Sequence, residues 1–137
     1  MQREAAPDWT RQYVGKPYQP PYGCLLLVAD VLREQFKVKC IPPIVETLPS
    51  ETYNSNRARA AAITEALSKY TVPAVGPARC GGMLVIINVG GKPCHIGILA
   101  SENWLLHSIE GTDAIIEPLD SVRIRNRIGG FFKVVAV

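Results

Sequence analysis

The stretch HIGILASENWLLHS, residues His95–Ser108, decides the fold of this 137-residue chain. Two apolar runs flank the polar segment Ser101–Asn103, a pattern that predicts two strands joined as a β-hairpin. With the turn centred there, the residue numbers of cross-strand partners sum to about 204, so His95 lies near position 109. Because offsets of two residues keep side chains on one face of a sheet, we expect His95 and His107 to share a face.

Outward from the hairpin, short β-branched runs between glycine-containing turns predict further strands, and apolar residues at helical spacing predict helices nearer the N-terminus. The predicted strands are Met83–Val89, His95–Ala100, Trp104–Ser108, Ala114–Glu117 and Phe131–Val137. The predicted helices are Ala5–Val14, Cys24–Lys37, Arg57–Tyr70 and a short capped one at Asp120–Arg127, with Lys39–Asn56 as a long ordered loop. Helices followed by an antiparallel sheet indicate the α+β class.

The composition fits a single domain over residues 1–137, with 47% apolar and 20% charged residues. The net charge of +3 is too small to indicate nucleic-acid binding, and the alternating arginines of Arg123–Arg127 are expected to form a solvated face. The longest apolar runs, Cys24–Ala29 and Met83–Ile87, fall far short of the roughly 18 residues of a membrane span, so we expect no membrane insertion. Met1–Pro17 is charged and polar, so we expect no standard secretion signal.

Only two histidines and four cysteines are available for imidazole, thiol or metal chemistry. The cysteines form no C-x-x-C pair and match no zinc-finger spacing. Cys94 and His95 could in principle form a tetrahedral zinc site with His107 and Cys80, but neighbouring residues on a strand point to opposite faces. We therefore expect no metal and no disulfide framework, and we expect Cys40, Cys80 and Cys94 to be small buried core residues.

Cys24 differs from the other cysteines because it stands in the first turn of a predicted helix. The helix dipole and the backbone N–H groups there favour a thiolate, and the same N–H groups can stabilise an oxyanion. The alternative role is that of a small buried core residue. Together with two histidines on one face, Cys24 indicates nucleophilic catalysis by a Cys–His–His constellation. An activated thiolate would react with iodoacetamide well below about pH 8.

Four segments, in order along the chain, resemble motifs of the NlpC-type papain-like cysteine peptidases, which cut peptidoglycan peptides. They are similar to the family's Gly-x-Pro-Tyr lead-in, its Asp-Cys-x-Gly-Leu-Val nucleophile turn, its His-Val-Gly-Ile base strand and its Leu-His-Ala strand. The segments are Tyr13–Tyr18, Gly23–Val28, His95–Ile98 and Leu105–Ser108. The stretch Ile115–Phe132 is similar to the ending of the tail-tip members found in phages and gene-transfer particles. The resemblance covers nearly the whole chain.

The resemblance implies a papain-like fold with N-terminal helices packed on an antiparallel sheet. Cys24 is the implied nucleophile, His95 the general base and His107 the residue that orients it, while Tyr18 and Gly23 occupy the substrate-binding positions. The implied reaction is thiol hydrolysis of a murein stem-peptide amide, with no cofactor. The implied setting is a phage or prophage tail, with tail-tip or baseplate proteins as partners. The location would be the virion or, before assembly, the cytoplasm.

Two residues depart from the family motifs. Gly23 replaces an acidic residue that can anchor a substrate amine, so the resemblance does not extend to recognition of a free L-Ala amine. Leu26 replaces a glycine and either narrows the cleft or packs in the core.

Two alternatives remain open at the level of the sequence. The first is a catalytically inactive structural component of a phage tail tip on the same fold. Trp104, Phe131 and Phe132 would then be docking surfaces, although core packing also accounts for them. The second is an acyltransferase or amidase on the same scaffold.

Overall fold

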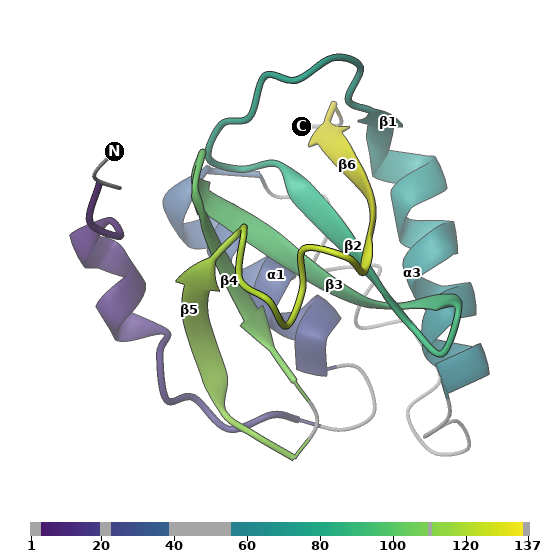
Figure 1. Ribbon diagram of the computed structural model, residues 1–137, viewed down its shortest axis with the longest axis horizontal. Coiled ribbons are helices and arrows are strands. Elements are labelled where there is room, and N and C mark those ends of the chain that lie inside the picture. The colour runs from purple at the N-terminus through teal and green to yellow at the C-terminus, as the bar shows by residue number, and fades with distance from the viewer. Residues whose placement is uncertain (1–3, 20–22, 39–55, 110, 136–137) are drawn as a thin grey trace.

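A computed structural model describes residues 4–19, 23–38, 56–109 and 111–135 (Figure 1). Within these residues the strands form one six-stranded antiparallel sheet, in the order β1-β6-β2-β3-β4-β5. The strands are β1 (Thr71–Pro73), β2 (Leu84–Val89), β3 (Lys92–Ser101), β4 (Trp104–Ser108), β5 (Ala114–Pro118) and β6 (Ile128–Val134). Helices α1 (Gly23–Gln35) and α3 (Asn56–Tyr70) pack on the sheet, so the predicted α+β class is confirmed.

The helices agree with the sequence pattern except at the two ends of the chain. Helices α1 and α3 match their predicted spans within two residues. The predicted N-terminal helix Ala5–Val14 is shorter and tighter, a 3-10 helix over Asp8–Gln12 that ends at Tyr13. Most of the predicted loop Lys39–Asn56 lies outside the described residues. In the part of the chain that the structure describes, no helix combines the length and apolar character needed to cross a membrane.

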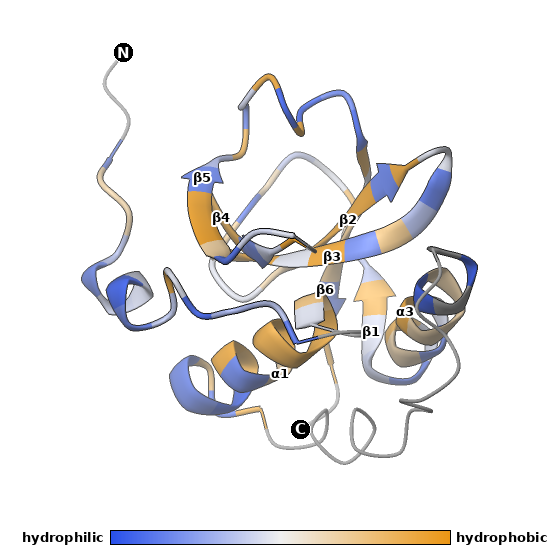
Figure 2. Cartoon of the chain, turned by 90° about the horizontal axis from the view of Figure 1, so that it is seen from below, coloured by the Kyte–Doolittle hydropathy of each residue, from blue (hydrophilic) through white to orange (hydrophobic). Residues whose placement is uncertain are grey.

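The two faces of the sheet belong to two different hydrophobic clusters. Side chains such as Ile96, Ile98 and Leu106 form the cluster that α1 and α3 cover. Their strand neighbours Leu99 and Leu105 belong to the second cluster, on the opposite face. Figure 2 shows hydrophobic residues along most of α1 and along β4 and β5, with hydrophilic residues at one end of the helix. Burial of these apolar surfaces is what holds the helices on the sheet.

The β3–β4 hairpin has the register predicted from its turn. Ile98 pairs with Leu106 and Leu99 with Leu105, so partner numbers sum to 204, and an irregularity follows toward the turn. Gly97 allows the two strands to approach closely, because a Cβ at this position would lie 2.7 Å from Leu105 Cδ1 and 3.0 Å from His107 Cβ. Alternation along each strand therefore places His95, Gly97 and His107 on the face opposite the helices.

The segment between β5 and β6 is not the predicted helix Asp120–Arg127. It forms successive turns, in which the backbone N–H groups of Ile124 and Arg125 both donate to the carbonyl oxygen of Ser121. Ile124 is buried against the second hydrophobic cluster and fixes the segment to the sheet. Because burial of this one side chain needs no helical face, the turns do not continue as a helix, and the chain enters β6.

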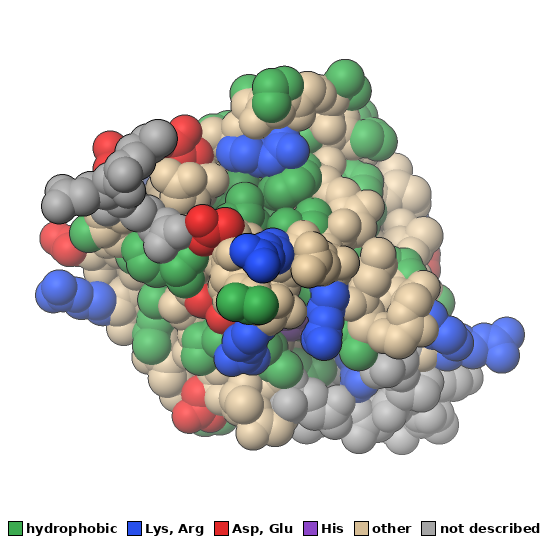
Figure 3. Space-filling view, viewed as in Figure 1, with side chains coloured by type: hydrophobic (Ala, Val, Ile, Leu, Met, Phe, Trp, Pro, Cys, Tyr) green, Lys and Arg blue, Asp and Glu red, His purple; other side chains and the backbone are tan. Residues whose placement is uncertain are grey.

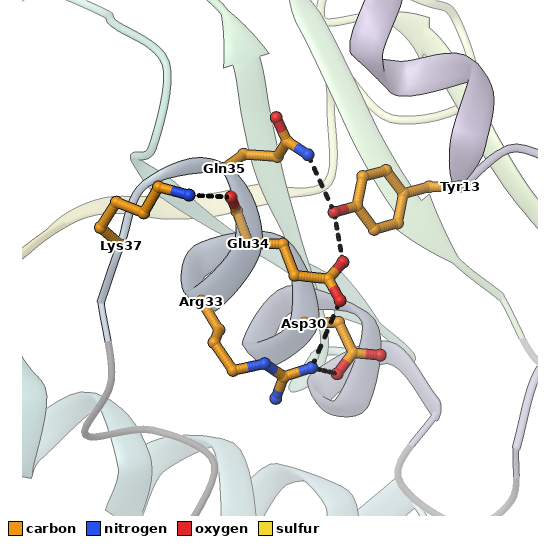
Figure 4. Close-up of polar contacts among 6 residues, drawn as sticks. All are labelled: Tyr13, Asp30, Arg33, Glu34, Gln35 and Lys37. Carbon is orange, nitrogen blue, oxygen red and sulfur yellow. Dashed lines mark hydrogen bonds and ion pairs between the residues drawn. The ribbon is translucent and has the colours of Figure 1, made fainter.

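The N-terminal segment is fastened to the C-terminal end of α1 by Tyr13 (Figure 4). The Tyr13 ring is fully buried, and its hydroxyl donates to Glu34 Oε1 at 2.6 Å. Gln35 Nε2 in turn donates to the Tyr13 oxygen at 3.2 Å. Beside these residues, Arg33 pairs with Asp30 at 2.7 Å. This network sets the path of the chain that leads toward Tyr18 and the start of α1.

Candidate active site

The thiol of Cys24 is buried at the first turn of α1. The residue is 2% exposed and belongs to the cluster beneath the helices. The paired part of β3 and β4 ends at Ile98 and Leu106, and beyond it the backbone N–H of Ile96 donates to the Cys24 sulfur. The sulfur therefore lies against the β3 backbone at the residue that follows His95.

The environment of Cys24 favours a neutral thiol. Burial raises its pKa from 9.0 to about 11. Backbone N–H groups of Ile96, Leu25 and Cys24 and the charge of Arg59 act in the opposite direction, and they are outweighed. The expectation that the helix start yields a resting thiolate is therefore wrong, because desolvation exceeds the effect of the helix N-terminus.

The two histidines meet as the hairpin register predicts. His95 Nε2 and His107 Nδ1 lie 2.7 Å apart, with ring centroids separated by 5.0 Å. His107 is fully buried, whereas His95 is half-buried. The prediction that both imidazoles share one face is confirmed, and the two rings also contact each other.

Glu117 extends this pair into a chain of three side chains. Its Oε1 lies 2.8 Å from His107 Nε2, across the β4–β5 ladder. A carboxylate can only accept, so His107 carries its proton on Nε2 and presents a bare Nδ1 to His95. His95 must then donate through Nε2, which leaves Nδ1 of His95 as a bare nitrogen. In the described part of the chain, no hydrogen bond engages that nitrogen.

Both imidazoles are neutral at neutral pH. Burial, together with the neighbouring His107 and Arg59, lowers the pKa of His95 from 6.5 to about 3. Burial also lowers the pKa of His107 to about 4, assisted by Arg123. The contact between His107 and Glu117 is therefore a hydrogen bond that a neutral ring donates. His95 donates to His107, and His107 donates to Glu117.

Cys24, His95 and His107 line one pocket with a volume of about 300 Å³. Tyr18, the residue predicted to bind substrate, also lines this pocket. Gly23 does not line this pocket and borders a separate one of about 250 Å³. A Cβ at Gly23 would lie 2.6 to 2.8 Å from atoms of the Tyr18 ring, so the glycine makes room for that ring. Four of the five predicted site residues thus converge.

Other predictions have mixed outcomes. Leu26 packs against the core beneath the helices and borders the Gly23 pocket rather than the pocket of Cys24. Cys94 is buried as expected and Cys80 is exposed, which contradicts the prediction for it, because it lies in the open segment before β2. Cys40 lies outside the described residues. Among the described residues, no three His, Cys, Asp or Glu side chains are arranged to hold a metal ion.

Four charged residues of the site were not identified from the sequence. Glu117 stands two residues from Ile115, the cross-strand partner of His107, so the register argument used for the histidines would have found it. Arg59, on α3, lines the pocket and nothing in its local sequence indicates this. Arg123, Arg125 and Arg127 are all exposed, as predicted, and Arg123 and Arg127 in addition line the pocket, which the sequence pattern did not indicate.

Comparisons with known proteins leave the family open: no family model matches the chain, and no curated protein matches it. Function is therefore inferred from the residues of this pocket and from their geometry.

Proposed function

We propose that this chain is a cysteine peptidase with a papain-like fold that hydrolyses an amide bond in peptidoglycan stem peptides. The observation that carries the proposal is the hydrogen-bonded chain Glu117–His107–His95, which ends at the pocket that Cys24 also lines. A nucleophile, a base and a group that orients the base are the parts that nucleophilic acyl transfer requires. The resemblance of the motifs to NlpC-type peptidases supports the choice of substrate and a role in a phage or prophage tail.

In the proposed reaction, the Cys24 sulfur attacks the amide carbonyl carbon while its proton passes to Nδ1 of His95. Backbone N–H groups at the start of α1 stabilise the oxyanion that forms. The C–N bond then breaks, and the amine leaves with the proton held by His95. A water molecule, deprotonated by His95, hydrolyses the resulting thioester and restores the Cys24 thiol.

His107 and Glu117 act on this reaction through His95. The hydrogen bond from His95 Nε2 to His107 Nδ1 holds the base in the tautomer that can accept a proton at Nδ1. Glu117 fixes the tautomer of His107 in the same way. His95 can therefore accept and release a proton at Nδ1 while its hydrogen bond to His107, and that of His107 to Glu117, stay in place.

The experiment that tests the proposal is digestion of purified murein sacculi, with released products identified by mass spectrometry. We expect the wild type to generate new peptide ends and Cys24→Ala to generate none. Cys80→Ala is the matched control, because Cys80 is an exposed thiol outside the pocket, and this variant should cleave like the wild type.

A second candidate is a catalytically inactive structural component of a phage tail tip. Burial of the Cys24 thiol and its raised pKa favour this candidate. The aromatic residues assigned to docking argue against it, because Phe131 and Phe132 pack on the two hydrophobic clusters and Trp104 donates to Glu4 O at 2.6 Å. No cleavage by the wild type, together with normal assembly and infection by Cys24→Ala particles, would favour the structural candidate.

A further inference from the structure

Three arginines from two separate segments surround the pocket of Cys24. Arg59 comes from α3, and Arg123 and Arg127 come from the turns between β5 and β6. The other described lining residues are apolar or carry phenol, thiol or imidazole groups, and none carries a carboxylate. Figure 3 shows Lys and Arg side chains grouped around the point where a histidine reaches the surface. The described lining of the pocket therefore holds three cationic side chains and no acidic one, while the chain as a whole carries only +3.

The positive charge acts on the reacting groups themselves. The charge of Arg59 acts to lower the pKa of His95 and opposes the rise that burial causes in the pKa of Cys24. Arg123 acts to lower the pKa of His107. An anionic group bound near these arginines would be attracted by the same field.

The turns between β5 and β6 hold two of the arginines at the pocket and exclude the third. Ile124 is buried, and its burial fixes the backbone of the residues on either side of it. Backbone N–H donation from Arg127 to Ile124 O at 2.8 Å closes the next turn. Arg123 and Arg127 line the pocket, and Arg125 between them does not. Within the part of the chain that the structure describes, neither Arg123 nor Arg127 forms an ion pair.

We propose that Arg123 and Arg127 bind a carboxylate of the substrate, so that the enzyme selects acidic peptides over their neutral amides. This inference rests on the proposed peptidase function. The guanidinium group matches a carboxylate because its N–H donors form two parallel hydrogen bonds with the two oxygens. A pocket of about 300 Å³ has room for one such side group beside the reacting carbonyl.

The first test compares hydrolysis of a stem peptide carrying free carboxylates with hydrolysis of the same peptide after conversion of those carboxylates to carboxamides. We expect kcat/KM for the acid to exceed that for the amide by about tenfold or more. The double variant Arg123→Ala/Arg127→Ala should lose this preference, and Arg125→Ala should retain it. Equal kcat/KM values for the two peptides with the wild type would overturn the proposal.

The second test needs no hydrolysis and uses the Cys24 thiol as a probe of the pocket. Iodoacetate is anionic and iodoacetamide is neutral, and both alkylate thiolates. At about pH 10 we measure the rate of alkylation by iodoacetate divided by the rate by iodoacetamide, using peptide mass spectrometry. This ratio should be higher at Cys24 than at exposed Cys80. Arg123→Ala/Arg127→Ala should reduce the Cys24 ratio about tenfold, and Arg125→Ala should leave it unchanged.

The two tests separate the failure of the inference from the failure of the proposed function. One outcome is that no hydrolysis occurs but the ratio of iodoacetate to iodoacetamide rates at Cys24 depends on Arg123 and Arg127. This outcome would reject the peptidase function and support an anion-binding pocket. The opposite outcome is that hydrolysis occurs but the ratio is the same in the wild type and in Arg123→Ala/Arg127→Ala. This outcome would support the peptidase function and reject the proposed carboxylate site.

Discussion

The two ends of helix α1 carry polar networks that differ in where their hydrogen bonds lead. At the C-terminal end, the Tyr13 hydroxyl donates to Glu34 and accepts from Gln35, beside the Arg33–Asp30 pair (Figure 4). At the N-terminal end, the chain from Glu117 through His107 to His95 stops at a nitrogen that no described residue engages, in a pocket shared with Cys24. Both networks contain strongly perturbed pKa values, at Tyr13 in one and at Cys24 and His95 in the other.

The comparison shows that a perturbed pKa does not by itself mark a functional site. The pKa of Tyr13 is raised by burial and by Glu34, which accepts a hydrogen bond from the Tyr13 hydroxyl in the same network. Cys24 and His95 are also perturbed by burial, and they line a cavity that admits another molecule. We therefore expect substitutions at the N-terminal end of α1 to change activity and those at its C-terminal end to change stability alone.

The largest effect is expected from Cys24→Ala. If Cys24 is the nucleophile as proposed, removal of its sulfur should reduce kcat/KM for murein hydrolysis roughly 10⁴-fold or more, because the remaining binding groups provide only residual catalysis. The rate should be measured on sacculi alongside Tyr13→Phe, which should cleave at the wild-type rate. Comparable losses in both variants would remove the distinction between the two ends of the helix.

The next largest effect concerns the pH dependence of Cys24 alkylation. Because burial raises the pKa of Cys24 to about 11, its reaction with iodoacetamide should accelerate about 100-fold between pH 8 and pH 10. Peptide mass spectrometry reads this rate separately from that of exposed Cys80. A fast rate at Cys24 that is constant from pH 6 to about pH 9 would instead indicate a thiolate paired with a protonated His95.

A smaller loss of activity is expected when Glu117 is changed. Glu117→Ala removes the acceptor at His107 Nε2, so His107 loses its fixed tautomer and His95 its orientation. We expect kcat to fall roughly 10- to 50-fold with little change in KM, since the base itself remains. Glu117→Gln should recover part of the rate, because its amide oxygen can still accept. A change in KM alone would assign Glu117 to substrate binding and contradict a positioning role.

The sequence was sufficient for those features that depend on local pattern. The turn Ser101–Asn103 fixed the register of one hairpin, and that register brought His95 to His107. Glu117 required the register of a second strand pair, β4 with β5, in which Leu105 is its partner. Helical spacing located Cys24 at the start of α1, but spacing carries no information on burial, and burial decides the protonation state of the thiol.

The arginines of the pocket were beyond the reach of sequence patterns for a different reason. Arg59 lines the pocket only because α3 packs on the sheet from a distant position in the chain. Arg123 and Arg127 line it because burial of Ile124 fixes the turns between β5 and β6, whereas a helix in the same segment would have given another arrangement. Long-range packing therefore decides the charge of the site, and the local sequence does not.

The smallest effect is expected from Tyr13→Phe, which tests the C-terminal end of α1. Loss of the 2.6 Å hydrogen bond to Glu34 should lower the free energy of unfolding by about 1–2 kcal/mol, measured in urea at neutral pH. Tyr70→Phe is the matched control, because in the described part of the chain the Tyr70 hydroxyl makes no hydrogen bond. A loss as large in Tyr70→Phe would assign the effect to packing.

The pH dependence of the same variant gives the sign of this contribution. The pKa of Tyr13 rises from 10.0 to about 12 through burial and the hydrogen bond to Glu34, so the folded state holds the phenol proton more tightly than the unfolded state. The stabilisation is therefore fully present below about pH 10 and is lost as the pH rises through about 12. Tyr13→Phe should flatten this alkaline decline while leaving the pH dependence of Cys24 alkylation unchanged. A change at Cys24 would mean that the two ends of α1 are coupled.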